Sequence, residues 1–420
     1  MKKVFISSLI MTLMLTNISL VNISSVQAAT TDDTGVASTD NTIKVSLDTI
    51  RDIVIENNLD IKVYENNKKI AQQEYDDARK AYNDSTTAVT NATTAVTNAN
   101  SAVTSANAAV TNATNAVDVQ TAKDKAAANL VTAKAALDAA NKNVATTDTT
   151  LTTKRDNLSK VNDDYDTHVE TNVSTAEAEY LTYLYDLSMQ KINEDTVKSN
   201  EKSEQVYKLQ YESGFISKNA YTDYLQANTS VNDSNASKDT VELDRTKLSN
   251  TLGISLEENI TFNTDINQDF QIISKIKYDD DLNQMLDNNI AIKQQNTVIS
   301  DLKDKESDYD SKDQSDIYNY TLENDNNTLQ QLINNKQTTF MNQYNDLMKS
   351  YNAIQSSYNV ILQKQKEYQD SQTQYDYGFI SKNALDTVKL SLDNQNATFV
   401  KSRNDCYLKY LQYIEMKEGY

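Results

Sequence analysis

The sequence lacks the residues that interrupt helices and most of those that build catalytic or metal sites. Its 420 residues include no proline, no tryptophan, five glycines, one cysteine and one histidine. Turns of sheets and barrels depend on glycine and proline, so their scarcity disfavours a large β-structure and favours long helices. A single cysteine, Cys406, excludes an intrachain disulfide, and a single histidine, His168, leaves carboxylates as the remaining metal ligands. We therefore predict no enzyme activity, no cofactor and no metal site.

Positive charge and long apolar segments are also scarce. The formal net charge is −20, which disfavours nucleic acid as a partner because phosphate binding needs clustered lysine and arginine. Apolar residues make up 38% of the chain, a fraction typical of coiled coils that bury only a stripe. Beyond the N-terminus, no segment approaches the ~18 consecutive apolar residues of a transmembrane helix. The expected fold is therefore all-α, built from long helices outside the bilayer.

The N-terminus has the three parts of a secretory signal peptide. Lys2 and Lys3 form a short basic region, an apolar stretch follows, and "VQA" supplies small residues for cleavage after Ala28 or Ala29. We predict that residues 1–28 are a cleaved signal peptide and that residues 29–44 form a disordered polar lead-in. The mature chain is then exported to the cell envelope.

Two phrases occur twice and divide the chain into tandem repeats. "ENNLDIK" begins at Glu56 and "DNNIAIK" at Asp287, and each precedes a long helical stretch that leads to "GFISKNA". We assign repeat 1 to residues 45–260 and repeat 2 to residues 261–420. The interval from Asn58 to Gly214 is 67 residues longer than that from Asn289 to Gly378. One insertion at about residues 86–154 accounts for the difference.

The inserted stretch carries a heptad pattern. Val89, Val96, Val103, Val110 and Val117 recur every seven residues, each of the first four followed three residues later by alanine. An odd period would place these valines on alternating faces of a strand, so the pattern predicts a helix with a coiled-coil stripe. A second series comprises Leu130, Leu137, Val144, Leu151 and Leu158. The phase break between the series marks either a hairpin turn or a stammer, and the alternative for the stretch is a spacer without fixed fold.

Each "GFIS" predicts a tight turn between two helices. Gly214 and Gly378 suit the left-handed position that ends a helix, and Ser217 and Ser381 suit the N-cap of the next helix. Phenylalanine after each glycine can fold back onto the preceding turn, and the apex carries two exposed apolar residues. Because phenylalanine, isoleucine, lysine and asparagine are also identical in the two copies, we predict a shared partner contact at both turns.

This ordered set of motifs resembles the TolC family of outer-membrane efflux ducts. Members of that family have a signal peptide and two tandem repeats, each with an "ENNxxI"-like helix, a long helix, a glycine turn and a returning helix. The matching segments here are "YESGFIS" from Tyr211, "YDYGFIS" from Tyr375, the returning helix from Tyr224 and "LGIS" from Leu252. The resemblance covers about residues 46–84 and 171–420.

The resemblance implies a homotrimer whose long antiparallel helical hairpins form an α-barrel tunnel. It places the glycine turns at the tunnel's inner end, where a membrane-fusion adaptor docks and an inner-membrane transporter energises export. The docking residues implied are Gly214, Phe215, Ile216, Ser217, Gly378, Phe379, Ile380 and Ser381. The chain is then a passive efflux or export duct in the cell envelope, at the outer membrane or at the cell surface or wall.

The sequence departs from the family pattern in two places. No pair of alternating ~9–11-residue strands is found, so we expect the family's β-barrel to be absent or minimal. The acidic tunnel constriction, expected six and nine residues after each glycine, is reduced to Asp223 in the first repeat and an offset Asp386 in the second. The alternative function is an exported coiled-coil structural or surface spacer without a conduit.

Overall fold

The structure, a computed structural model, describes residues 42–111, 116–256, 259–263, 270–306 and 312–420. The predicted signal peptide and nearly all of the predicted lead-in lie outside the described residues. Ile43 and Lys44, at the end of that lead-in, belong to a strand, so regular structure begins two residues earlier than the sequence indicated.

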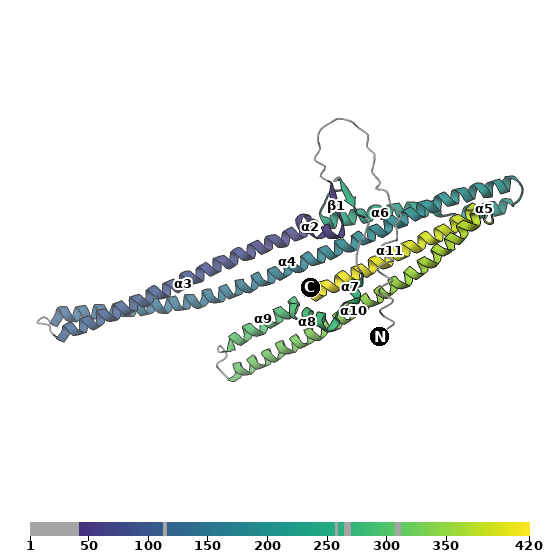
Figure 1. Ribbon diagram of the computed structural model, residues 1–420. Coiled ribbons are helices and arrows are strands. Elements are labelled where there is room, and N and C mark those ends of the chain that lie inside the picture. Colours follow the sequence, from purple (N-terminus) through teal and green to yellow (C-terminus); the bar gives the residue numbers. More distant parts are fainter. Residues whose placement is uncertain (1–41, 112–115, 257–258, 264–269, 307–311) are drawn as a thin grey trace, which may run out of the picture. The chain divides into compact units, whose positions relative to one another are not determined.

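Long helices dominate the described residues (Figure 1), which confirms the all-α fold with long hairpins expected from the missing proline. In chain order the elements are β1 (Ile43–Val45), α2 (Leu47–Asn57), α3 (Leu59–Thr111), α4 (Ala116–Glu212), α5 (Lys218–Ala227), α6 (Ser230–Leu252), β2 (Ile260–Phe262), α7 (Gln271–Ser274), α8 (Tyr278–Asn288), α9 (Ile290–Asp304), α10 (Lys312–Asp376) and α11 (Lys382–Glu418).

The chain divides into two compact units that do not coincide with the two sequence repeats. One unit, here called the arm, contains residues 60–168, and the other, the body, contains residues up to 59 together with residues 169–420. The arm includes the whole heptad stretch. Both glycine turns lie in the body.

The arm is an antiparallel helical hairpin of α3 and the first part of α4. Near the open end the ring of Tyr64 stacks on His168 with centroids 3.7 Å apart, and Lys154 pairs with Glu74 at 2.9 Å. Further along, the hydroxyls of Ser85 and Thr147 are 2.8 Å apart. Residue numbers rise on one helix as they fall on the other, which defines a hairpin rather than a spacer without fixed fold.

The seam of the arm follows the predicted heptads, with one correction. Val89, Val96 and Val103 of α3 and the leucine series of α4 are half-buried along the contact. Val117, expected to continue the first series, is 73% exposed, and Val119 takes the seam position instead. The reason is that α3 ends at Thr111 and α4 begins at Ala116, so Val117 already belongs to the returning helix. The phase break is a shift inside α4, and the chain reverses before it.

The long helices of the body contact one another in the order α6, α4, α11, α10. Lys238 of α6 lies 3.9 Å from Glu194 of α4, and the Asn404 amide of α11 donates to the Leu181 carbonyl of α4 at 3.1 Å. Phe340 of α10 stacks on Tyr413 of α11 with centroids 4.9 Å apart. The order leaves α6 and α10 as the two outer helices of this set.

A two-stranded parallel sheet joins the start of the body to its middle. β1 pairs with β2 in the register Ile43 with Ile260, and Val45 is fully buried. Tyr180 of α4 is buried against the sheet and donates its hydroxyl to the Asn263 carbonyl. The sheet thereby fixes the segment ahead of α2 beside α4.

The repeated "NN" phrase contacts the end of the last helix in both halves. The buried amide of Asn58 donates to the Thr251 carbonyl at 2.8 Å, at the end of α6, and the buried amide of Asn289 donates to the Gly419 carbonyl at 3.2 Å, after α11. Each final helix ends on a left-handed glycine, Gly253 or Gly419. A Cβ on either glycine would collide with the backbone of the facing asparagine pair. These asparagines join the first helix of each half to its last.

Candidate functional site

The two glycine turns are here called the first tip (residues 214–217) and the second tip (residues 378–381). Gly214 and Gly378 have φ angles of +77° and +78°, as predicted. In the first tip Phe215 N donates to the Gln210 carbonyl at 2.8 Å and Gly214 N to the Tyr211 carbonyl at 3.0 Å. The second tip has the same pair of bonds at 2.8 and 2.9 Å. This is the Schellman pattern, which pairs the last carbonyls of α4 and α10.

The serine of each tip starts the next helix in the predicted manner. The side-chain oxygens of Ser217 and Ser381 each accept a bond from the backbone nitrogen three residues on, at 3.2 Å. The two serines have nearly the same backbone angles, φ −76° and −75°. The tips are therefore equivalent in backbone and in capping.

The two apolar residues expected to be exposed at the apex of each tip differ in their burial. Phe215 and Phe379 are 83% and 79% exposed, as expected of the apex, and so they do not fold back onto the preceding turn. Ile216 and Ile380, expected to be exposed, are half-buried. The Schellman bonds are made by the backbone, so they do not require the phenylalanine to pack. Each tip thus presents one phenylalanine ring to solvent.

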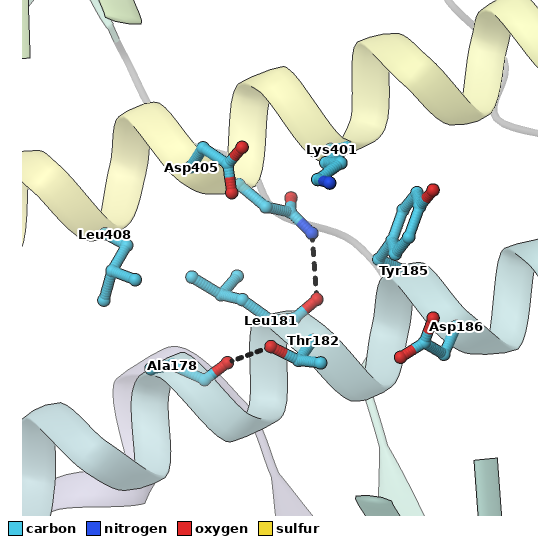
Figure 2. Close-up of a pocket in the computed structure, with 9 residues that line it drawn as sticks. Ala178, Leu181, Thr182, Tyr185, Asp186, Lys401, Asp405 and Leu408 are labelled. Carbon is cyan, nitrogen blue, oxygen red and sulfur yellow. Dashed lines mark hydrogen bonds between the residues drawn. The ribbon is translucent and has the colours of Figure 1, made fainter. Parts of the chain in front are cut away.

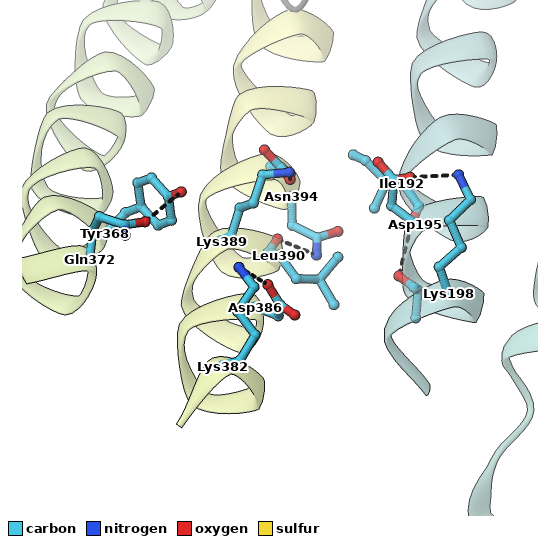
Figure 3. A network of polar contacts seen from close by, with 12 residues as sticks. Ile192, Asp195, Lys198, Tyr368, Gln372, Lys382, Asp386, Lys389, Leu390 and Asn394 are labelled. Carbon is cyan, nitrogen blue, oxygen red and sulfur yellow. Dashed lines mark hydrogen bonds and ion pairs between the residues drawn. The ribbon is translucent and has the colours of Figure 1, made fainter. Parts of the chain in front are cut away.

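The two tips lie near each other in the body. Ser203, on the last turns of α4, donates to the Asn383 side-chain oxygen at the start of α11, at 2.9 Å. Farther from the tips, the pKa of Asp393 on α11 is raised mainly by burial. The nearby carboxylate of Asp195 on α4 adds to this upward shift. Figure 3 shows this stretch of α4 beside α11. The start of α11, next to the second tip, therefore lies beside α4 eleven residues before the first tip.

The predicted constriction residues have unequal environments. Asp223 lies on α5 and is exposed. Asp386 lies on α11 with its carboxylate 3.0 Å from the Lys382 ammonium, one helical turn away (Figure 3). Lys382 also lies over the Tyr375 ring. Lys382 partly offsets the charge of Asp386, whereas Asp223 has no such ion pair among the described residues, and a tunnel constriction at these two residues stays a prediction.

Tyrosines stiffen the helix pair above the first tip. Tyr207 of α4 stacks on Tyr224 of α5 with centroids 4.1 Å apart, and Tyr211 stacks on Tyr221 at 5.5 Å. The Tyr224 hydroxyl also donates to the Asn200 carbonyl at 3.0 Å. Because α5 has no buried residue, these stacked rings and the serine cap hold it against α4.

A group of carboxylates around one arginine was not found from the sequence. Arg51 of α2 makes a two-pronged ion pair with Glu170 of α4. Burial, and then the neighbouring Glu415 carboxylate of α11, raises the pKa of Glu177 to about 7. Burial also raises the pKa of Glu415 to about 7, against a hydrogen bond from Ser174. The signal in the sequence was the spacing of Glu170 and Glu177, seven residues apart on one helix face.

A cavity of about 290 Å³ opens between α4 and α11 (Figure 2). Its lining mixes charged and apolar side chains, among them Lys401 and Asp405 of α11 and Leu181 and Asp186 of α4. The Lys401 ammonium lies 5.6 Å from the centre of the Tyr185 ring. Water in this cavity can reach the Asp186 carboxyl.

Two features of the described residues bear on metal and thiol chemistry. Within the described ranges, no cluster of three or more histidine, cysteine or acidic side chains is placed to hold a metal ion. Cys406 is fully buried, and burial raises the pKa of its thiol to about 12, which keeps it protonated and unreactive. None of the described helices is apolar over a length that would cross a membrane.

No protein-family model and no curated protein matches the chain. Among solved structures, the chain is similar to CusC, in a study of its folding and transmembrane channel formation (12% identity, 64% of this chain and 72% of that one, TM-score 0.46). It is also similar to the outer membrane protein VceC from Vibrio cholerae (12% identity, 65% and 76%, TM-score 0.45).

A third similarity extends over nearly the whole chain. A membrane protein from Pseudomonas aeruginosa aligns over 90% of this chain and 91% of its own, with 9% identity and a TM-score of 0.55. At such identity the comparison concerns the fold. What it shows is a likeness of fold to a membrane protein, built like this chain from long helices.

Proposed function

We propose that the chain is a subunit of an efflux or export duct of the cell envelope, a passive conduit for solutes delivered by a membrane-fusion adaptor and an inner-membrane transporter. The observation that carries the proposal is the pair of equivalent tips at one end of the body, each exposing a phenylalanine. Two equivalent exposed phenylalanines suit a partner that presents the same apolar binding surface more than once.

The outer helices of the body favour a homo-oligomer. On α6, Val231 and Leu243 are exposed, and on α10, Met341 and Leu362 are exposed. Apolar side chains on both outer helices of a set suit head-to-tail contacts with further copies, because such contacts close into a ring. Together with the family resemblance, this supports a trimer whose helices surround a tunnel.

Two measurements test the duct. The mature protein should have a trimer's mass by light scattering, and Leu243→Glu should lower that mass while the circular dichroism stays helical. Val131→Glu, on an exposed position of the arm, is the matched control and should leave the trimer intact. A wild-type protein that is monomeric under all conditions would contradict the proposal that the chain forms a duct.

The docking role of the tips is tested separately. Phe215→Asp with Phe379→Asp should abolish capture of a co-expressed membrane-fusion adaptor while the trimer persists. Unchanged capture would refute the tips as the docking site, and the duct would then need another contact.

The arm favours a second candidate, an exported coiled-coil spacer without a conduit. The arm is long: α3 alone, with 53 residues, extends about 80 Å at ~1.5 Å per residue. Adaptor docking at the tips does not require an extension of this length. A spacer needs no ring, so a stable monomer that fails to capture an adaptor is the outcome expected of this alternative.

A further inference from the structure

The cavity between α4 and α11 is lined by two carboxylates and one ammonium. Asp186 of α4 and Asp405 of α11 supply the carboxylates, and Lys401 of α11 supplies the ammonium. None of the three forms a salt bridge with another side chain in the described part of the chain. The cavity volume of about 290 Å³ lies at the lower end of the range of ligand pockets, about 300–1,000 Å³, so it suits a small molecule.

Lys401 differs from the other lysines of its helix. Those lysines each lie 2.9–3.9 Å from a carboxylate oxygen, and they are Lys382, Lys389, Lys409 and Lys417. The Lys401 ammonium lies instead over the Tyr185 ring, 5.6 Å from its centre. Burial raises the pKa of Asp186, and the charge of Lys401 acts against that rise. The positive charge of Lys401 therefore serves the part of the cavity formed by Tyr185 and Asp186.

Asp405 lies beside apolar side chains instead. In Figure 2 Leu181 and Leu408 lie toward the end of the cavity away from Tyr185. Leu408 follows Asp405 by three residues, so the two share one face of α11. The Asp405 side chain is exposed, and a ligand can therefore reach it from solvent. A carboxylate next to an apolar surface complements a positive charge carried on an apolar body.

The uncharged polar groups of the lining are already bonded to the backbone. The Thr182 hydroxyl donates to the Ala178 carbonyl at 2.9 Å, and the buried Asn404 amide donates to the Leu181 carbonyl at 3.1 Å, as Figure 2 shows. Because these donors are engaged, the charged side chains are the groups that decide which ligand fits.

We propose that this cavity binds a small organic monocation, whose ammonium group pairs with Asp405 and whose apolar body packs against Leu181 and Leu408. Two carboxylates against one lysine give the lining an excess of negative charge, which favours a cation over an anion. A primary ammonium donates directly to a carboxylate, in a bond stronger than one between neutral groups. The site lies within one chain, so the inference stands whether or not the chain forms a duct.

Binding of phenethylammonium to the full mature chain tests the site. A ligand-observed NMR titration at pH 8 in ~0.15 M salt should give a dissociation constant on the order of 1 mM, as expected of a ligand of this size. Methylammonium has the charge without the apolar body, and phenylacetate has an apolar body with the opposite charge. Each should bind at least about tenfold more weakly. If methylammonium bound equally well, the acidic surface would explain the binding and the proposal would be overturned.

Three substitutions locate the binding at Asp405. Asp405→Asn should weaken phenethylammonium binding about tenfold, because it removes the paired charge. Lys401→Met should tighten binding about threefold, because it removes a positive charge one helical turn from Asp405. Asp239→Asn is the matched control on α6, outside the cavity, and should leave binding unchanged.

The three substituted side chains are exposed, so circular dichroism should show the wild-type helix content in each variant. An Asp405→Asn protein that binds phenethylammonium as tightly as the wild type would overturn the proposal. A Lys401→Met protein that binds no more tightly than the wild type would do the same.

Discussion

At the residue scale, the glycines that end helices are of two kinds. Some are required only by the backbone conformation, and others are also required by the close approach of a neighbouring helix. Gly214 and Gly378 need only a left-handed conformation, because a Cβ on either would meet no other atom within 4 Å. Gly253 and Gly419 need that conformation and also the empty space against an asparagine pair. Among the acidic residues, most are solvated, whereas Glu177 and Glu415 lie at contacts between helices.

The two kinds of glycine predict different costs of substitution. Gly214→Ala should destabilise by about 1 kcal/mol, the strain of a left-handed alanine. Gly253→Ala should cost about 3 kcal/mol, because its Cβ also collides with the Asn57 backbone carbonyl and must push α2 from α6. Urea unfolding followed by circular dichroism measures both. Equal costs would contradict the close approach at Gly253.

The half-buried glutamates Glu177 and Glu415 predict a stability that falls as the pH rises. The pKa values of Glu177 and Glu415 are raised from 4.5 to about 7, so the folded chain binds more protons than the unfolded chain between these values. Their stabilising contribution is full below pH 4.5 and is lost as the pH rises through 7.

Glu177→Gln should therefore raise the free energy of unfolding at pH 8 by about 1–2 kcal/mol and flatten its decline between pH 5 and pH 8. Glu201→Gln serves as the exposed control on the same helix. Urea titrations at several pH values provide the measurement, and an unchanged slope in Glu177→Gln would count against the cluster.

At the scale of elements, the arm and the body use different packing. The arm is a two-helix coiled coil whose seam of alanine, valine and leucine is mostly half-buried, with backbone-bonded threonines such as Thr93 and Thr97 on its surface. The body adds aromatic contacts, such as Phe340 against Tyr413. A two-helix seam buries less apolar area per residue, so the arm should be the less stable unit.

The seam of the arm predicts a local weakness. Leu137→Ala should destabilise the arm by about 1–2 kcal/mol, because Leu137 is half-buried in the contact between α3 and α4. Val131→Ala, at a position 68% exposed on the same helix, should change stability by less than about 0.5 kcal/mol. Hydrogen exchange of the arm amides distinguishes the two, and equal effects would mean that the seam lies elsewhere.

At a larger scale, the duplicated halves contact each other beside the second tip and eleven residues ahead of the first tip. Ser203 and Asn383 are 180 residues apart in sequence and yet hydrogen-bonded. The body therefore carries both tips on one chain, which spaces the two phenylalanines before any assembly occurs.

That contact predicts an intrachain cross-link. A chain with Ser203→Cys and Asn383→Cys should be linked within itself by a short thiol-reactive cross-linker, because Cys406 is fully buried and does not compete. Peptide mass spectrometry and faster migration on a denaturing gel report the link. Each single variant is the control. If only a product of dimer mass formed, Ser203 and Asn383 of one chain would not be in contact.

Local features of this protein were predictable because neighbouring residues decide them. The helical class follows from missing proline and scarce glycine, and the tips follow from glycine and serine placed three residues apart. The heptads predicted the seam, although the chain reverses between Thr111 and Ala116, ahead of the phase break where a turn was one of the alternatives. The "NN" phrase was recognised as a repeat, while its partner carbonyls, nearly two hundred residues away in the first half, could not be read from spacing.

The sequence by itself determined helix class, the two equivalent tips and their capping, since these depend on backbone preferences within a few residues. Only the tertiary structure decided that phenylalanine and not isoleucine is exposed at each tip, and which carboxyls gather around Arg51. Burial and charge at a helix contact depend on the partner helix, and the partner is set by the packing of the whole body.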